Sequence, residues 1–193
     1  IVRRRLFKNV QSDIPSHLVC RAFADLYAEN SDKFPAETRD AAYLRRLKAS
    51  YPIHPEVFER LYEDWSTLPK FQRTRGVLRL MARMVHSLWR SDNRDYLILP
   101  GSIPLDDHSV RNELIKYLPS GWDPIIDKDI DGTNAEPRRI DDSAATLGSI
   151  QACRRVARAI FLGSAPSVGT QKVRGIGVER VRLGCVQPGQ SPG

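Results

Sequence analysis

The stretch from Lys70 to Asn93 places the strongest constraint on the fold, because it predicts one long helix with two chemically different faces. Its apolar residues recur at steps of three and four, the spacing that puts side chains on one side of a helix. They are Val77, Leu78, Met81, Val85, Leu88 and Trp89. Such a face is stable only against other apolar segments, so this helix is predicted to line a core.

The opposite side of the same helix is polar and mostly basic. It carries Gln72, Arg75, Arg79, Arg83, His86 and Arg90. Two interpretations stay open. Charged residues normally cover the solvent side of an amphipathic helix; alternatively, one or more of these arginines contacts an anion.

The length and charge of the chain limit the alternatives. With 193 residues, it can form one domain with a core of its own or two small subdomains that share an interface. The 30 Lys and Arg residues exceed the 23 acids and give a formal net charge of +7. This excess favours phosphate-bearing partners, although it is spread over the whole chain.

The compartment is predicted from the cysteines and from apolar run lengths. The three cysteines are far apart and form no CxxC pair, which indicates a reducing compartment: Cys20, Cys153 and Cys185. No apolar run approaches the ~20 residues that span a bilayer, so we expect a cytoplasmic protein with no membrane partner. Because the chain begins at Ile1 and ends in PGQSPG, we expect a piece of a longer protein.

Further helices follow from apolar periodicity and from start and stop signals. They are predicted over Ser16–Asn30, from Pro35 to about Ser50, from Pro55 to about Trp65, from Asp106 or Asp107 to Leu118, and over Ser143–Leu162. Asp95–Pro100 (DYLILP) is the best strand candidate. His54 precedes Pro55 and is expected to cap the third helix or to bond within its turn.

These elements predict a mainly α fold with a small β component (α+β). A helical bundle is expected over residues 1–94. A smaller α+β unit is expected over residues 95–193, incomplete at its C-terminus. Its helix, strand and glycine turns suggest a winged-helix-like arrangement.

Motifs for metal and nucleophilic chemistry are incomplete. Asp127, Asp129, Asp131 and Gly132 open like a calcium loop, but the twelfth position, which needs a bidentate acid, is Arg138. We therefore expect a solvated acidic loop, or acids that pair with an arginine face elsewhere. Nothing links His54 to Ser164 as a nucleophilic pair, and GxxxxGK[ST] does not occur.

Two arginine rows could contact nucleic-acid phosphates. One is Arg75–Arg90, and the other, Arg154, Arg155 and Arg158, is predicted to point outward. The exposed aromatic residues that a single-strand binder uses are missing, because Tyr and Trp fall mostly on apolar faces. A helical DNA-binding module is therefore the alternative function.

Five blocks of the sequence are together more specific than any single motif. They are YPIHPEVFERLYEDW, FQRTRGVLRLMARMVHSLW, LILPGSIPL, RRVARAIFLGSAP and ERVRLGCVQPG. In combination they resemble a family of large bacterial P-loop ATPases of the AAA type, catalogued as a domain of unknown function and similar to ATPases of phage-defence and DNA-modification islands. The resemblance runs from Arg4 to Gly189 and implies the region downstream of the nucleotide-binding core, with the helical bundle as the lid.

The resemblance also implies a site. In AAA-type ATPases an arginine at the start of the lid helix reaches the nucleotide's terminal phosphates; Arg75 is the closest match and Arg73 the second. ATP and Mg²⁺ would be bound by the upstream core of the same protein, since its phosphate-binding lysine and metal-binding acids are absent here. A homo-oligomer is implied, with Arg75 acting in its own subunit or a neighbour's, and Arg3, Arg4 and Arg5 are candidates for a subunit contact.

Overall fold

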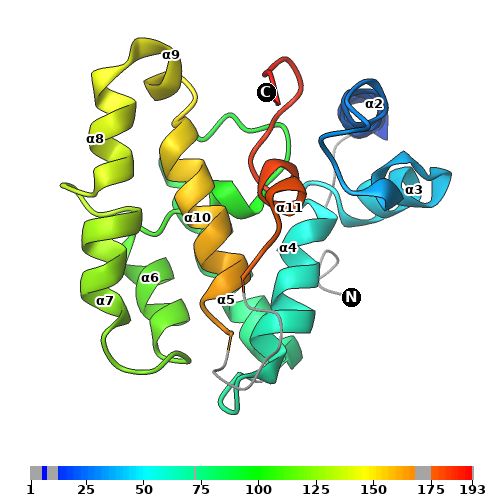
Figure 1. Ribbon diagram of the computed structural model, residues 1–193. Coiled ribbons are helices and arrows are strands. Elements are labelled where there is room, and N and C mark those ends of the chain that lie inside the picture. Colours follow the sequence, from blue (N-terminus) through cyan, green and yellow to red (C-terminus); the bar gives the residue numbers. More distant parts are fainter. Residues whose placement is uncertain (1–5, 8–12, 72, 168–174, 193) are drawn as a thin grey trace.

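The fold was analysed in a computed structural model, which describes residues 6–7, 13–71, 73–167 and 175–192. It is mainly helical (Figure 1). The longer helices are α2 (Asp13–Glu29), α3 (Ala41–Ser50), α5 (Arg73–Arg90), α6 (His108–Ile115), α8 (Glu136–Ser143) and α10 (Ala152–Ser164). The shorter ones are α4 (Pro55–Glu59), α7 (Trp122–Ile125), α9 (Ala145–Gly148) and α11 (Val178–Leu183).

Helices α2 and α3 form one side of the molecule, at the right of Figure 1. Their facing surfaces are aromatic, and the rings of Tyr27 on α2 and Tyr43 on α3 lie 6.0 Å apart between centroids. The core here also receives Leu97, Leu99 and Leu183 from distant parts of the chain. Non-local apolar residues therefore complete the packing of the first two helices.

Helix α4 begins as the sequence predicted. His54 is its N-cap, and its Nδ1 accepts a hydrogen bond from the amide of Glu56 at 3.1 Å, while Pro55 occupies the first turn. The predicted cap is confirmed. The helix continues through a π-turn (Arg60–Asp64) and a 3₁₀ turn (Trp65–Thr67).

The core face of α5 is rotated relative to the prediction. Leu80 and Met84 are fully buried beside Val77, Met81 and Leu88, whereas Trp89, predicted to face inward, is 79% exposed. Apolar residues cover so much of this helix that their spacing alone fits two orientations. The structure places the centre of the buried face near Met84.

The predicted strand over Asp95–Pro100 is reduced to a single bridge. Ile98 pairs in parallel with Ile53, through the amide of His54 to Ile98 O and the amide of Ile98 to Pro52 O, both at 2.9 Å. No other strand pairing occurs in the described ranges. The small β component and the winged-helix-like unit are therefore not confirmed.

Helix α10 passes through the middle of the second half, with α6 to α9 on its left in Figure 1 and α11 on its right. It begins later than predicted, because Gln151 adopts a left-handed conformation (φ 54°) that separates it from α9. Behind it, Gly101 lies in a 3₁₀ turn (Pro100–Ser102), and a Cβ there would meet Arg155 O at 2.9 Å and Gly184 O at 3.0 Å.

The second hydrophobic core joins residues from both sides of the predicted boundary at residue 94. Trp65 is fully buried, and its Nε1 donates to Leu162 O in α10 at 2.8 Å. Phe161 packs edge-on against Trp65, with 6.0 Å between the ring centroids. The division into 1–94 and 95–193 stays a prediction.

Candidate functional site

The predicted site residue Arg75 lies on the first turn of α5. It is exposed, and no hydrogen bond or ion pair joins its side chain to another described residue. Arg73 begins the helix, but its side chain lies outside the described part of the chain, as do Arg3, Arg4 and Arg5. The structure therefore presents Arg75 to solvent, and none of the described residues compensates its charge.

Packing at the start of α5 holds Arg75 in place. Gly76 is buried, and a Cβ there would lie 3.2 Å from the ring of Phe71. The Phe71 ring in turn packs edge-on against Tyr117, with 4.9 Å between centroids. Since Phe71 and Gly76 flank the first turn, the backbone that carries Arg75 is tied to the core.

The next two arginines of the row face a buried carboxylate. Glu113 of α6 has a side chain only 2% exposed, and Arg83 Nε lies 3.4 Å and Arg79 Nε 3.9 Å from its oxygens. Lys116 Nζ approaches Glu113 Oε1 at 2.5 Å, and Tyr117 Oη donates to the same oxygen at 3.0 Å. Arg79 and Arg83 therefore hold an internal charge as well as covering a surface.

The second predicted row does not point outward. The side chains of Arg154, Arg155 and Arg158 are only 11%, 12% and 6% exposed. Arg158 donates through Nε and Nη2 to Asp131 at 2.7 and 2.9 Å, and Arg154 Nε donates to the same carboxylate at 2.8 Å. The prediction of an exposed arginine row on α10 is wrong, because a loop acid covers it.

The same contacts show how Asp131 of the acidic loop is held. Asp131 is completely buried and accepts from the two arginines and from the amide of Asp106 at 3.0 Å. Asp127 lies 3.3 Å from Arg111 Nη1. Pairing of the loop acids with arginines elsewhere in the fold is confirmed. Burial lowers the pKa of Arg158, which Asp131 partly counteracts.

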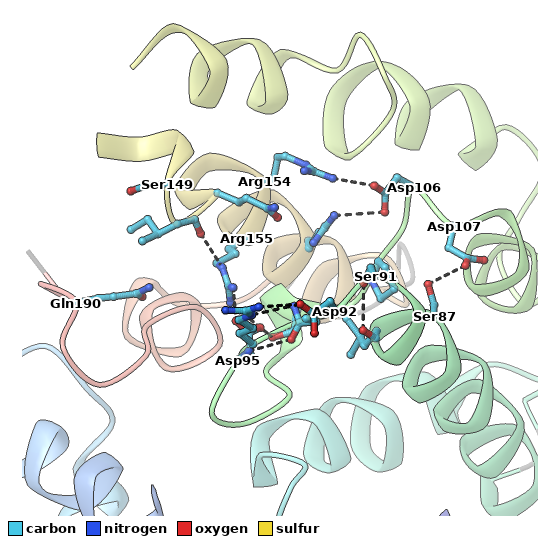
Figure 2. Close-up of a pocket in the computed structure, with 18 residues that line it drawn as sticks. Ser87, Ser91, Asp92, Asp95, Asp106, Asp107, Ser149, Arg154, Arg155 and Gln190 are labelled. Carbon is cyan, nitrogen blue, oxygen red and sulfur yellow. Dashed lines mark hydrogen bonds and ion pairs between the residues drawn. The ribbon is translucent and has the colours of Figure 1, made fainter. Parts of the chain in front are cut away.

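A cavity of about 610 Å³ lies beside this network, where α5 ends and α10 begins (Figure 2). Figure 2 shows Arg154 directed toward Asp106 and Arg155 toward Asp95; Arg155 Nη1 donates to Asp95 Oδ2 at 3.0 Å. Four arginines and four aspartates line it: Arg94, Arg154, Arg155, Arg158, Asp92, Asp95, Asp106 and Asp107. Because these formal charges balance, the cavity favours neither an anion nor a cation.

Asp107 on the cavity wall has a structural role. Burial acts to raise its pKa, but hydrogen bonds from Ser87 Oγ (2.7 Å) and from the amides of Ser109 and Val110 hold the pKa below its ordinary value. It is the N-cap of α6. Arg75 does not line this cavity, which starts at Ser87, twelve residues or about 18 Å further along the helix.

The buried titratable groups do not form a nucleophilic site. Burial lowers the pKa of His54 to about 3, and the imidazole is held by the Glu56 amide and by Tyr27 Oη at 2.9 Å. Burial also raises the pKa of the Cys185 thiol to about 12. A neutral histidine with both nitrogens occupied and an un-ionised thiol are structural groups.

Comparison with known families supports only part of the resemblance that the five sequence blocks suggested. Residues 1–177 match the family described as DUF499 second domain. The chain belongs to the DUF499 family. No curated protein and no solved structure matches the chain. Membership in a domain family of unknown function is thus supported, and the AAA-type ATPase character stays a prediction.

The DUF499 match includes Arg75, Glu113 and the α10 network, but it ends before α11. In the described part of the chain, no group of three or more His, Cys, Asp or Glu side chains could hold a metal ion. Mg²⁺ and ATP stay predictions for an upstream core. None of the helices in the described ranges is long and apolar enough to cross a membrane.

Two residues of the chain, Glu113 within the DUF499 match and Arg180 beyond it, were missed by sequence reasoning. Glu113 lies on the apolar stripe of α6, between Val110 and Leu114, and that position predicts a buried acid needing a cation. Arg180 of α11 contacts Glu56 Oε2 at 2.9 Å, and Glu56 is completely buried. Nothing local marks this second pair, because 124 residues separate its partners.

Proposed function

We propose that this chain is the lid-containing region that follows the nucleotide-binding core of an AAA-type ATPase. In this function Arg75 contacts the terminal phosphates of the nucleotide, and Arg73 is the second candidate for this contact. The chain holds no complete active site of its own. It couples ATP binding and hydrolysis in the core to a change in conformation.

The observation that supports this proposal best is the contrast between Arg75 and five of the six other arginines in the two rows; the sixth, Arg90, lies at the opposite end of α5. Arg79, Arg83, Arg154, Arg155 and Arg158 all face carboxylates, whereas Arg75 faces none among the described residues. A planar guanidinium that is always charged suits bidentate contact with phosphate oxygens. Arg75 therefore has its hydrogen-bonding capacity available for a ligand.

The position of Arg75 on its helix supports the same assignment. Arg73 and Arg75 lie in the first turn of α5, which is the positive end of the helix dipole. This turn contains no acidic residue that would offset their charges. Cations there are disfavoured by about 0.3–1 kcal/mol each. A phosphate bound at this end would remove that penalty and accept hydrogen bonds from the free amides of the first turn.

The test uses the longer protein that carries the upstream core. Removing one group that stabilises developing charge lowers kcat by about 10²- to 10³-fold, and we expect this for Arg75→Ala with an unchanged circular dichroism spectrum. Arg75→Lys should restore part of the rate, because it keeps the charge without the fork. Arg45→Ala, on the exposed side of α3, is the control and should leave the rate unchanged.

Two outcomes would contradict the proposal. An unchanged ATPase rate in Arg75→Ala removes Arg75 from the mechanism. ATP hydrolysis by the isolated 193-residue chain would show that the core is not supplied from upstream. If the protein forms oligomers, mixing wild-type and Arg75→Ala subunits separates action within one subunit from action on its neighbour.

A further inference from the structure

Helix α5 carries a charge excess that the described residues around it neutralise only in part. Its 18 residues include five arginines and His86, and no Asp or Glu. Arg75, Arg79 and Arg83 follow one another at steps of four, the spacing at which like charges repel on a helix surface. No acidic residue lies between these arginines on the helix, so the outer face of α5 is strongly basic.

Glu113 faces the middle of this row, and its single negative charge is smaller than the sum of the positive charges around it. Glu113 is approached by Arg79, Arg83 and Lys116, which together carry three positive charges. These three side chains remain 45%, 44% and 37% exposed, and the two arginine contacts are long. Two of the three charges are therefore left for an anion at the surface between α5 and α6.

An exposed aromatic residue lies on the same face. Trp89 is 79% exposed, whereas Trp65 is fully buried and Trp122 is half-buried. At about 100° per residue, Trp89 falls with His86, Arg79, Arg83 and Arg90 within an arc of about 120° around α5. The buried residues Val77, Met84 and Leu88 occupy the opposite side.

We propose that the outer face of α5 is an interaction surface for single-stranded nucleic acid, in which Arg79, Arg83 and Arg90 contact phosphates and Trp89 stacks on a base. The arginines span eleven residues, or about 16 Å, which is long enough to meet several phosphates. A base can stack on the exposed indole only if it is not already stacked in a duplex, so the surface selects single strands. Among the described residues, Asp107 is a further acid whose charge interacts with Arg90.

This surface does not depend on the proposed ATPase function. It uses neither Arg75 nor bound ATP, and every variant below keeps Arg75. An unchanged ATPase rate in Arg75→Ala would leave it intact, and loss of nucleic-acid binding would leave the role of Arg75 intact.

Binding is measured with the 193-residue chain and a mixed-sequence 20-nucleotide DNA strand, by fluorescence anisotropy over a range of salt concentrations. Each phosphate contact to a single strand contributes about 0.7 to the slope of log K against log salt. Arg90→Gln should lower the slope by about 0.7, and the double variant Arg79→Gln, Arg83→Gln by about 1.4. Trp89→Ala should weaken binding by about 5- to 150-fold, a stacking loss of about 1–3 kcal/mol, with the slope unchanged.

The controls match these variants in charge and shape. The double variant Arg45→Gln, Lys48→Gln removes two charges from α3 and should leave the affinity within about twofold of the wild type, as expected for residues outside the contact. Trp89→Phe keeps an aromatic ring and should retain most of the affinity. Arg90 and Trp89 are exposed, so their variants report binding even if loss of the Glu113 partners impairs folding of the double variant.

Four results would overturn the proposal. They are no binding at low salt, equal binding of the annealed duplex, equal binding of polyglutamate at the same charge, and unchanged affinity in Trp89→Ala. The third result would assign the face to acidic polymers in general. The second would assign it to duplex phosphates without stacking.

Discussion

Arg75 and Arg79 lie four residues apart on one face of α5, yet only Arg79 faces a buried carboxylate. The difference comes from Glu113 on another helix, which approaches Arg79 and Arg83 but not Arg75. A residue's own periodicity places it on a face of its helix, whereas its role depends on what the neighbouring helix presents there. Arginines with the same spacing along α5 thus have different neighbours in the structure.

The buried histidine shows how one side chain links pH to stability. His54 is completely buried, and burial lowers its pKa to about 3, with the positive charge of Arg46 as a further cause. In the unfolded chain the pKa is about 6.5. Between these values the unfolded state binds the proton and the folded state does not, so stability falls as the pH is lowered below 6.5.

We predict that lowering the pH from 7 to 5 costs the wild type ~2 kcal/mol of unfolding free energy more than it costs His54→Asn, from the His54 pKa shift over 1.5 pH units. Asn keeps an N-cap acceptor but does not titrate. Denaturant titrations at both pH values measure the difference. The raised pKa values of Glu56 and Asp64 act with the opposite sign but are common to both proteins.

His17→Asn, which changes an exposed histidine on α2, serves as the control and should follow the wild type at both pH values. Parallel pH profiles for the wild type and His54→Asn would show that the buried ring does not contribute.

At the scale of elements, the sequence predicted helices more reliably than their orientation. The cap of α4 is found as predicted, and α2 (Asp13–Glu29) overlaps the predicted Ser16–Asn30 but begins three residues earlier; both depend on local signals. The α10 arginines were placed outward because their helix has an apolar face on the other side. A periodic pattern reveals that face but cannot reveal Asp131, which reaches the arginines from a loop more than twenty residues away.

Close contact between elements occurs at Gly101, where the 3₁₀ turn passes against α10 and α11. The amide of Gly101 donates to Gly184 O at 2.8 Å, and a Cβ would lie 2.9 Å from Arg155 O. The carbonyl oxygens of Arg155 and Gly184 are the atoms that this Cβ would meet, and as backbone atoms they cannot rotate away. We predict that Gly101→Ala lowers the unfolding free energy by ~1–3 kcal/mol, the usual cost of forcing an extra carbon into a packed site.

Thermal and denaturant unfolding of Gly101→Ala and Gly177→Ser measures this cost. Gly177 is the N-cap of α11 and has open space around it, so serine there should be neutral or stabilising. Equal stability of Gly101→Ala and the wild type would show that the three elements can separate without loss.

At the scale of the whole molecule, the two hydrophobic cores show why the sequence predicted a mainly helical fold but not how its segments pack. Both cores contain residues from each half of the chain, such as Leu97 and Leu183 against α2 and α3. Long-range pairs of this kind leave no periodic signal. The strand expected at Asp95–Pro100 was inferred from a run of apolar residues, and the structure uses that run to join the cores.

The last helix gives the sharpest test of this architecture, because the family match ends at Gly177 and α11 follows it. Arg180 reaches Glu37, Glu56 and Glu59, while Leu183 is fully buried in the core of α2 and α3. Gln187 Nε2 donates to Leu97 O at 3.0 Å. Residues 178–192 therefore neutralise a buried acid and complete a core, although they lie beyond the family's matched range.

We predict that a chain ending at Gly177 loses ~2.5–6 kcal/mol of unfolding free energy. Exposing the Leu183 site costs ~1.5–3 kcal/mol, and removing Arg180 leaves Glu56 short of a counter-ion at ~1–3 kcal/mol. Domains are stable by only ~5–15 kcal/mol, so the shortened chain should melt at a markedly lower temperature in calorimetry. Arg180→Ala should reproduce part of the loss and Arg182→Ala, on the same helix, little of it; a shortened chain that melts like the wild type would show that the family's matched range folds independently of α11.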